Sequence, residues 1–297
     1  MELGGVLSAI GRTPLIDLTP LLGDRGSVRL MAKAEFMNPG GSVKDRPALY
    51  IVMDALRSGE LTPDKRVLDA TSGNMGLGLA LVGASLGIGV TLVVPGSISQ
   101  HKLSMLRYLG SEVIVTDPLE GIDGAIRKAR EIYESDPKKY HYANQYDNPS
   151  NLRAHYETTG PEIIEQTRGK VTHFVAGVGT SGTLMGAGRR LREVVGRVRL
   201  IEVQPAEPLH GIEGLKNMSD AIVPKIYDEG FADERVFVKT EDAYNTARFL
   251  ARRFGLLIGP SAGANVHAAL SVARGLKEGV VVTVLPDGVY RYIGLLT

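Results

Sequence analysis

Thr172-His173-Phe174-Val175-Ala176-Gly177-Val178-Gly179-Thr180-Ser181-Gly182-Thr183 is a strand-like run followed by a glycine-rich loop. The run Thr172–Ala176 is continuous rather than alternating, as expected for a strand covered on both faces. Glycines let the backbone of such a loop approach a ligand closely, and N–H groups at the start of a following helix bind anions. Since the loop also carries three hydroxyl groups, it favours a phosphate monoester as its ligand.

Strand-like runs and helix-like patterns alternate along the rest of the chain. The other expected strands are Val28–Lys33, Arg66–Asp69, Val90–Val94, Glu112–Val115, Arg199–Val203 and Val280–Leu285. The expected helices are Pro47–Arg57, Leu77–Leu86, His101–Leu109, Gly121–Ser135, Ala243–Phe254 and Ala264–Ala273. This alternation predicts an α/β fold with parallel sheets and right-handed crossovers. The stretch Asn144–Asn151, which contains Pro149, is the best candidate for a domain boundary.

Composition is typical of a globular protein with one or two domains. The chain has 297 residues, an apolar fraction of 43% and a formal charge of 34 − 33 = +1. A balance this close to neutral does not favour nucleic acid or an anionic membrane as a partner. Without cysteine there is no disulfide, thiolate metal site or cysteine nucleophile, which fits a cytoplasmic protein. The six histidines are scattered, so no metal site is predicted.

Two stretches bear on targeting. Met1–Ile10 has no basic cluster and no long apolar run, so no signal peptide is expected. Ala70–Gln100 has no charged residue, but several glycines and Pro95 interrupt it. These interruptions predict a buried helix and a buried strand rather than a membrane-spanning helix.

A second glycine-rich stretch places a lysine just before an expected helix, Asn38-Pro39-Gly40-Gly41-Ser42-Val43-Lys44-Asp45-Arg46-Pro47. Pro47 fits the first turn of a helix, where its missing N–H costs nothing. The positive end of the helix dipole disfavours a protonated amine at Lys44. An unprotonated lysine can form a Schiff base or take a proton from carbon. A solvated lysine at a helix start is the simpler alternative.

Two further loops also lead into expected helices. Thr71-Ser72-Gly73-Asn74-Met75-Gly76 follows the strand that ends at Asp69, and it is either an anion site or an ordinary turn. Gly259-Pro260-Ser261-Ala262-Gly263-Ala264 contains a serine that is either a helix N-cap or a ligand-binding residue.

The loop Gly177–Gly182 also fits the G-x-G-x-x-G pattern of dinucleotide sites. Such a site needs an acid about 20 residues later, at the end of the next strand. Glu202 has this spacing, but the strand continues to Gln204, so the match is partial. An NAD-linked oxidoreductase and a non-enzymatic small-molecule-binding regulator therefore stay open as alternatives.

Taken together, these segments resemble the cysteine synthase family, pyridoxal-phosphate (PLP) enzymes of fold type II. The resemblance begins at Ile10-Gly11-Arg12-Thr13-Pro14-Leu15, includes Asn144-Gln145-Tyr146-Asp147-Asn148-Pro149 and ends near Leu285-Pro286-Asp287-Gly288. Thr172–Gly186 and Gly211–Met218 look most like the branch called cysteine synthase B or O-phosphoserine sulfhydrylase.

The implied fold has two three-layer αβα domains with mostly parallel sheets, as in the tryptophan synthase β-subunit, with the cofactor between them. The implied N-terminal domain comprises residues 1–11 and 38–147 and carries the Schiff-base lysine and the substrate loop. The implied C-terminal domain comprises residues 12–37 and 148–297 and carries the phosphate cup.

The resemblance implies a role for each matching residue. Lys44 corresponds to the catalytic lysine that holds PLP as a Schiff base. The other implied cofactor-binding residues are Asn74 at the pyridoxal 3′ oxygen, the phosphate cup Gly179, Thr180, Ser181, Gly182 and Thr183, and Ser261 at the pyridine nitrogen. The implied substrate-binding residues are Thr71, Ser72, Asn74, Met75, Gln145 and Lys216.

Two of these positions depart from the family pattern. Met75 stands where the family usually has threonine, and methionine cannot donate a side-chain hydrogen bond. Lys216 stands where O-phosphoserine users have a phosphate-binding arginine, and it lacks the planar fork of that residue. A solvated surface lysine is the alternative interpretation of Lys216.

The implied reaction is the replacement of the β-substituent of O-acetyl-L-serine or O-phospho-L-serine by sulfide, through an aminoacrylate, to give L-cysteine. Cystathionine β-synthase-like and serine or threonine dehydratase activities use the same lysine and phosphate cup, so they stay open. The resemblance also implies a cytoplasmic homodimer that takes an amino-acid substrate and a sulfur donor, with no metal, nucleic acid or membrane partner.

Overall fold

The computed structural model describes residues 4–24, 26–219 and 221–292. Met1–Leu3, part of the stretch for which no signal peptide is expected, lie outside these residues. The chain divides into unit 1, Met1–Ile10 with Lys44–Asn151, and unit 2, Gly11–Val43 with Leu152–Thr297. The unit boundaries therefore follow residues 10, 43 and 151, whereas the expected domain boundaries follow residues 11, 37 and 147.

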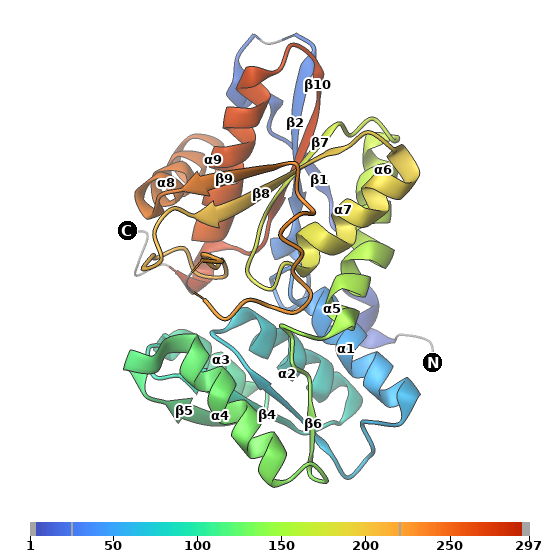
Figure 1. Ribbon diagram of the computed structural model, residues 1–297, viewed down its shortest axis with the longest axis vertical. Helices are drawn as coiled ribbons and strands as arrows, with labels where there is room; N and C mark the ends of the chain where they lie inside the picture. Colours follow the sequence, from blue (N-terminus) through green and yellow to red (C-terminus); the bar gives the residue numbers. More distant parts are fainter. Residues whose placement is uncertain (1–3, 25, 220, 293–297) are drawn as a thin grey trace. The chain divides into compact units, whose positions relative to one another are not determined.

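Unit 1 contains a parallel sheet with strand order β5-β4-β3-β6 (Figure 1). Its strands are β3 (Arg66–Ala70), β4 (Val90–Pro95), β5 (Glu112–Thr116) and β6 (Tyr140–Tyr142). Its helices include α1 (Asp45–Ser58), α2 (Asn74–Leu86), α3 (Gln100–Tyr108) and α4 (Gly121–Ser135).

Alternate residues of these strands build two apolar clusters in unit 1. Val67 and Leu92 pack in one cluster with residues of α1 and α2, such as Ile51 and Leu79. Their neighbours Leu68 and Val93 pack in another with Ala125, Ile126 and Ala129 of α4. Because neighbouring strand residues point to opposite faces, helices cover both faces of the sheet.

Unit 2 contains a sheet with strand order β1-β2-β10-β7-β8-β9, in which β1 is antiparallel to β2 and the other pairs are parallel. Its strands are β1 (Leu15–Asp17), β2 (Val28–Ala34), β7 (His173–Gly177), β8 (Arg199–Pro205), β9 (Glu234–Val238) and β10 (Gly279–Leu285). Its helices include α6 (Gly160–Thr167), α7 (Gly182–Val195), α8 (Thr240–Phe254) and α9 (Pro260–Gly275).

Helices also cover both faces of the unit 2 sheet (Figure 1), and an apolar cluster lies on each face. Val281 packs with the α8 and α9 residues Leu250 and Ala268, whereas its neighbour Val282 packs with the α6 and α7 residues Ile163 and Leu184. Each unit is thus a three-layer αβα structure with a mostly parallel sheet, which confirms the predicted fold class.

The expected strands and helices are present, and the chain contains further elements that were not expected. These are β1, β6, β9, α5 (Pro149–Ala154), a π-helical turn His155–Thr159, α6 and α7. In the structure, the π-helical turn carries the chain from α5 directly into α6, and Pro161 occupies the first turn of α6.

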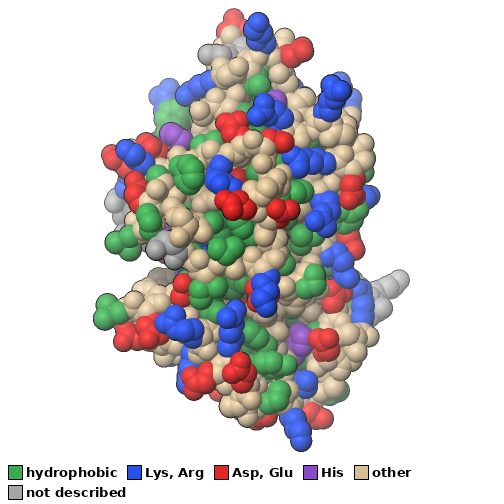
Figure 2. All heavy atoms as spheres, viewed as in Figure 1, with side chains coloured by type: hydrophobic (Ala, Val, Ile, Leu, Met, Phe, Trp, Pro, Cys, Tyr) green, Lys and Arg blue, Asp and Glu red, His purple; other side chains and the backbone are tan. Residues whose placement is uncertain are grey.

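Within the described residues, no helix combines the length and apolarity needed to cross a membrane. The uncharged stretch Ala70–Gln100 contains α2 and β4, as expected. Among the same described residues, no group of three or more His, Asp or Glu side chains could hold a metal ion. On the face in Figure 2, acidic and basic side chains are interspersed, in keeping with the formal charge of +1.

Candidate active site

Lys44 lies at the N-cap of α1 and is the first residue of unit 1 after the chain leaves unit 2. A Cβ added at Gly78 of α2 would lie 3.0 Å from the Lys44 carbonyl oxygen and 3.0 Å from the Ala48 Cβ. Glycine at this position therefore lets α2 pack against the start of α1. The packing fixes the backbone of Lys44 while its side chain stays half-buried.

The α2 loop, Thr71–Gly73, is closed by its threonine. The Thr71 Oγ1 accepts hydrogen bonds from the N–H of Gly73 at 3.0 Å and from the N–H of Gly76 at 3.1 Å. A hydroxyl oxygen that accepts twice still carries one proton to donate. With the N-terminus of α2 starting at Asn74, the loop offers a carboxylate a hydroxyl proton and the positive end of a helix dipole.

The remaining predicted substrate residues of unit 1 differ in how far their side chains are buried. Ser72 is exposed and Asn74 is half-buried. Gln145 is buried, and its Nε2 donates to the Ala70 carbonyl oxygen at 2.8 Å, directly before the α2 loop. The Met75 side chain packs in the apolar cluster of unit 1, so only its backbone N–H is left to serve a ligand.

Asp69 is a buried acid at the end of β3, two residues before Thr71. Burial raises the pKa of its carboxyl to about 7, and nearby polar groups of Ala70, Gln145 and Asn144 offset this only in part. A carboxyl that changes charge near neutral pH therefore lies beneath the α2 loop. The sequence analysis used Asp69 only to end a strand.

The α7 loop, Gly177–Ser181, packs against the segment Gly214–Lys216 of unit 2. A Cβ at Gly179 would lie 2.1 Å from the Gly214 carbonyl oxygen, and a Cβ at Gly177 would lie 2.5 Å from the Leu215 side chain. The Lys216 N–H donates to the Val178 carbonyl oxygen at 2.9 Å. The two glycines therefore allow a backbone approach that no larger residue permits.

Ser181 ends the α7 loop in a left-handed conformation, with φ of 70°, directly before Gly182 begins α7. It is 2% exposed, and its Oγ has no hydrogen-bond partner among residues 4–24, 26–219 and 221–292. A buried unpartnered hydroxyl at a helix N-terminus is costly by itself and fits an acceptor-rich ligand such as a phosphate ester.

Thr183, in the first turn of α7, is held by a residue that sequence analysis did not identify. Its Oγ1 lies 3.3 Å from the Nε2 of the buried His155, whose Nδ1 lies 2.9 Å from the Thr159 Oγ1. His155 begins the π-helical turn, and π-helical turns recur at functional sites. In the sequence this histidine is isolated, so no motif marks it.

Ser261 and Lys216 both lie near the α7 loop in unit 2. Ser261 is 3% exposed in the first turn of α9, and its Oγ lies 3.9 Å from a Cβ built on Gly214. Lys216 is 7% exposed, and its Nζ donates to the Ile222 carbonyl oxygen at 3.1 Å. The alternative of a solvated surface lysine at position 216 is therefore wrong.

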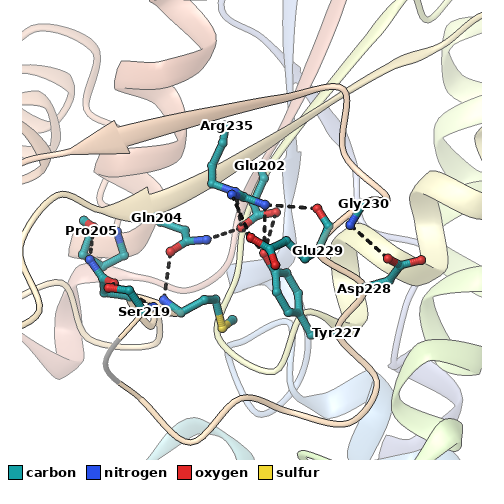
Figure 3. Close-up of polar contacts among 11 residues, drawn as sticks. Glu202, Gln204, Pro205, Ser219, Tyr227, Asp228, Glu229, Gly230 and Arg235 are labelled. Carbon is teal, nitrogen blue, oxygen red and sulfur yellow. Dashed lines mark hydrogen bonds and ion pairs between the residues drawn. The ribbon is translucent and has the colours of Figure 1, made fainter.

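Glu202 is the acid that a dinucleotide site would need, but its carboxylate interacts with other side chains of the protein (Figure 3). It is fully buried on β8, where Gln204 Nε2 and Tyr227 Oη donate to its carboxylate and the Arg235 Nε lies 3.4 Å away. A carboxylate surrounded in this way does not reach a ribose hydroxyl. This arrangement counts against the NAD-linked alternative.

Comparison with known proteins agrees with this geometry. The family described as pyridoxal-phosphate dependent enzyme matches residues 6–287. The cysteine synthase of Aquifex aeolicus is 48% identical over 294 residues, which cover 97% of this chain and 90% of that protein. The chain belongs to the cysteine synthase family of pyridoxal-phosphate-dependent enzymes.

Solved structures of this family share the whole fold. The cysteine synthase of Entamoeba histolytica superposes with a TM-score of 0.93 at 34% identity, covering 99% of this chain and 90% of that one. The O-acetylserine dependent cystathionine beta-synthase of Helicobacter pylori superposes with a TM-score of 0.92 at 36% identity, covering 99% and 98%. The fold type II architecture is thus confirmed.

PLP is the cofactor of this family, and the α7 loop fits its phosphate ester. Gly179 keeps the loop backbone clear of side chains, and Ser181 and the N-terminus of α7 supply donors. The cofactor and substrate roles of the individual residues stay predictions.

Proposed function

We propose that this chain is a cysteine synthase that converts O-acetyl-L-serine and sulfide into L-cysteine and acetate. In this reaction the Cβ–O bond of the substrate breaks, acetate leaves, and the sulfur of sulfide forms a bond to the same carbon. The observation that carries the proposal is the α7 loop, whose buried Ser181 hydroxyl has no hydrogen-bond partner among the described residues, in a chain 48% identical to a cysteine synthase.

In the proposed mechanism, bound PLP supplies an electron sink for the negative charge that develops at the substrate α-carbon. The N–H groups at the start of α7, with Thr180, Ser181 and Thr183, bind its phosphate, and Lys44 holds its aldehyde carbon covalently. Asn74 donates to its 3′ oxygen. Ser261 faces the ring nitrogen with a neutral hydroxyl, which favours the protonated ring less than a carboxylate does.

The α2 loop acts on the substrate. The free proton of Thr71 Oγ1 and the N–H groups that begin α2 bind the α-carboxylate, with Ser72 and Gln145 beside them. The amine of Lys44 would accept the α-proton of the bound substrate and later return it to the same carbon. Holding the carboxylate keeps the α-proton aimed at this amine.

A direct test combines a spectrum with one substitution. The purified protein should show a visible absorption band that borohydride reduction removes, with the reduced cofactor attached to Lys44 by mass spectrometry. Lys44→Ala should lower cysteine formation by about 10³-fold or more with an unchanged circular dichroism spectrum, because one amine serves two roles. Lys128→Ala, in exposed surroundings on α4, is the control. Wild-type turnover by Lys44→Ala would refute the assignment.

The H. pylori neighbour gives a reason to test a second sulfur donor. Steady-state assays with O-acetyl-L-serine should compare sulfide with L-homocysteine, and assays without a nucleophile should measure pyruvate release. We expect sulfide to give the highest kcat/KM. A higher value with homocysteine would make the chain a cystathionine β-synthase, and dominant pyruvate release would make it a dehydratase.

The proposal also covers O-phospho-L-serine, the cellular location and the assembly. Lys216 contacts the α7 loop through its backbone N–H, and its buried ammonium is a cation in the segment that follows the loop, which supports some acceptance of a phosphate leaving group. A cytoplasmic homodimer is supported by the family resemblance and by the cysteine-free composition. Kinetics with both serine donors and the mass of the purified protein by light scattering test these points.

A further inference from the structure

Lys102 is a buried cation in the first turn of α3. It is 2% exposed, and its backbone N–H is capped by the Ser99 hydroxyl. A positive charge in the first turn opposes the helix dipole, and burial of an ammonium costs several kcal/mol of solvation. Helix stability therefore does not explain a lysine at this position.

The Lys102 side chain lies across Gly73 of the α2 loop. A Cβ built on Gly73 would lie 2.9 Å from the Lys102 Cδ, 3.3 Å from its Cε and 3.5 Å from its Nζ. Gly73 itself has a φ of 151°, which side chains of L-residues rarely adopt. The glycine thus leaves room for the lysine stem and brings the ammonium beside the loop.

The hydrogen bonds that close the α2 loop join neutral groups. Thr71 Oγ1 accepts from Gly73 N–H and Gly76 N–H, and the loop leads into the N-terminus of α2. Met75, where the resemblance leads one to expect a hydroxyl, directs its side chain into the apolar cluster. A full positive charge beside these neutral donors adds an attraction for anions that a hydroxyl does not provide.

We propose that Lys102 is a specificity-determining residue that attracts the α-carboxylate of the amino-acid substrate to the α2 loop. This inference rests on the proposed function, in which the α2 loop receives that carboxylate. In this arrangement Gly73 and Lys102 act as a pair, since the glycine admits the side chain that carries the charge.

The first test is kinetic and uses the cofactor-loaded enzyme. Lys102→Met keeps an unbranched stem and removes the charge, whereas Lys102→Arg keeps a charge. We expect Lys102→Met to raise the KM for O-acetyl-L-serine by roughly 10- to 100-fold with kcat within about threefold of wild type. Lys102→Arg should recover most of the affinity. Lys128→Met, on the exposed face of α4, is the matched control.

The second test separates charge attraction from a structural effect. L-Serine and L-serinamide share an amine and a hydroxyl, but only serine has a carboxylate, and the binding of each can be followed by the visible spectrum of the cofactor. The wild type should prefer L-serine, and Lys102→Met should reduce this preference by about 10-fold. A structural effect would weaken both ligands alike, so an unchanged ratio would overturn the proposal.

Failure of the proposed function would look different. If the wild type forms no cysteine from O-acetyl-L-serine and sulfide, the proposed activity fails, while the serine-to-serinamide ratio still reports on Lys102. If the wild type forms cysteine and Lys102→Met has a wild-type KM, the proposed activity stands and the role of Lys102 fails.

Discussion

The α2 loop and the α7 loop both follow a parallel strand and lead into a helix N-terminus, but they use their hydroxyl groups differently. Thr71 Oγ1 accepts two backbone N–H groups of its own loop, whereas Ser181 Oγ has no partner within the described part of the chain. The α2 loop is thus closed by its own hydroxyl, whereas the α7 loop leaves a hydroxyl available for the proposed cofactor. This difference suits a substrate that comes and goes and a cofactor that stays.

The largest expected effect comes from filling the α7 loop. Gly179→Ala places a methyl group 2.1 Å from the Gly214 carbonyl oxygen, so the loop and the segment before Lys216 must separate. We expect PLP affinity, measured by titrating apoprotein and following absorbance, to fall about 100-fold or more. Gly275→Ala, in open space at the end of α9, should leave affinity unchanged. Equal affinities in both variants would contradict the need for close backbone approach.

Removing the two hydroxyl groups, one at a time, tests the comparison directly. Thr71→Val leaves two N–H groups without their acceptor, so the free energy of unfolding of the apoprotein should fall by about 2–3 kcal/mol in urea titrations. Ser181→Ala removes a buried hydroxyl that makes no hydrogen bond with the described residues, so apoprotein stability should stay the same or rise. Its cost should appear as a loss of roughly 10-fold in PLP affinity. The reverse pattern would show that the two loops do not differ as described.

A smaller expected effect is a pH dependence of the free energy of unfolding, which Asp69 next to the α2 loop causes. The pKa of Asp69 is raised from 3.8 to about 7, so between pH 4 and 7 the folded protein holds a proton that the unfolded chain has lost. Stability should therefore fall as pH rises through this range and level off above it. Asp69→Asn should remove roughly 1–2 kcal/mol of the fall between pH 5 and 7 in apoprotein urea titrations. The exposed Asp64→Asn is the control, and parallel pH profiles for Asp69→Asn and wild type would disprove the assignment.

Sequence reasoning succeeded where a short stretch determines its own conformation. Continuous apolar runs predicted the buried strands, and the glycine-rich segments around Lys44, Thr71 and Ser261 predicted loops that lead into helices. In these segments the need for glycine is visible in the letters themselves, because close backbone approach excludes other residues.

It failed where a side chain takes its role from distant packing. The sequence shows Met75 inside a ligand-binding motif, yet the cluster around Leu77 and Leu79 turns its side chain inward. His155 gains its partner Thr183 from a helix 28 residues away. Lys102 lies beside Gly73 because α2 and α3 pack together. Each of these depends on burial that no local pattern encodes.

The pairing of β2 with β10 has a consequence for how the chain is made. Residues 28–34 form a parallel ladder with residues 279–285, so one strand pairs with another that is synthesised much later. The continuous segment Lys44–Asn151 holds all four strands of the unit 1 sheet and is synthesised long before that ladder can form. In a nascent chain halted before β10, one edge of β2 therefore has no partner strand. The unit 2 sheet can form completely only after β10 has been synthesised.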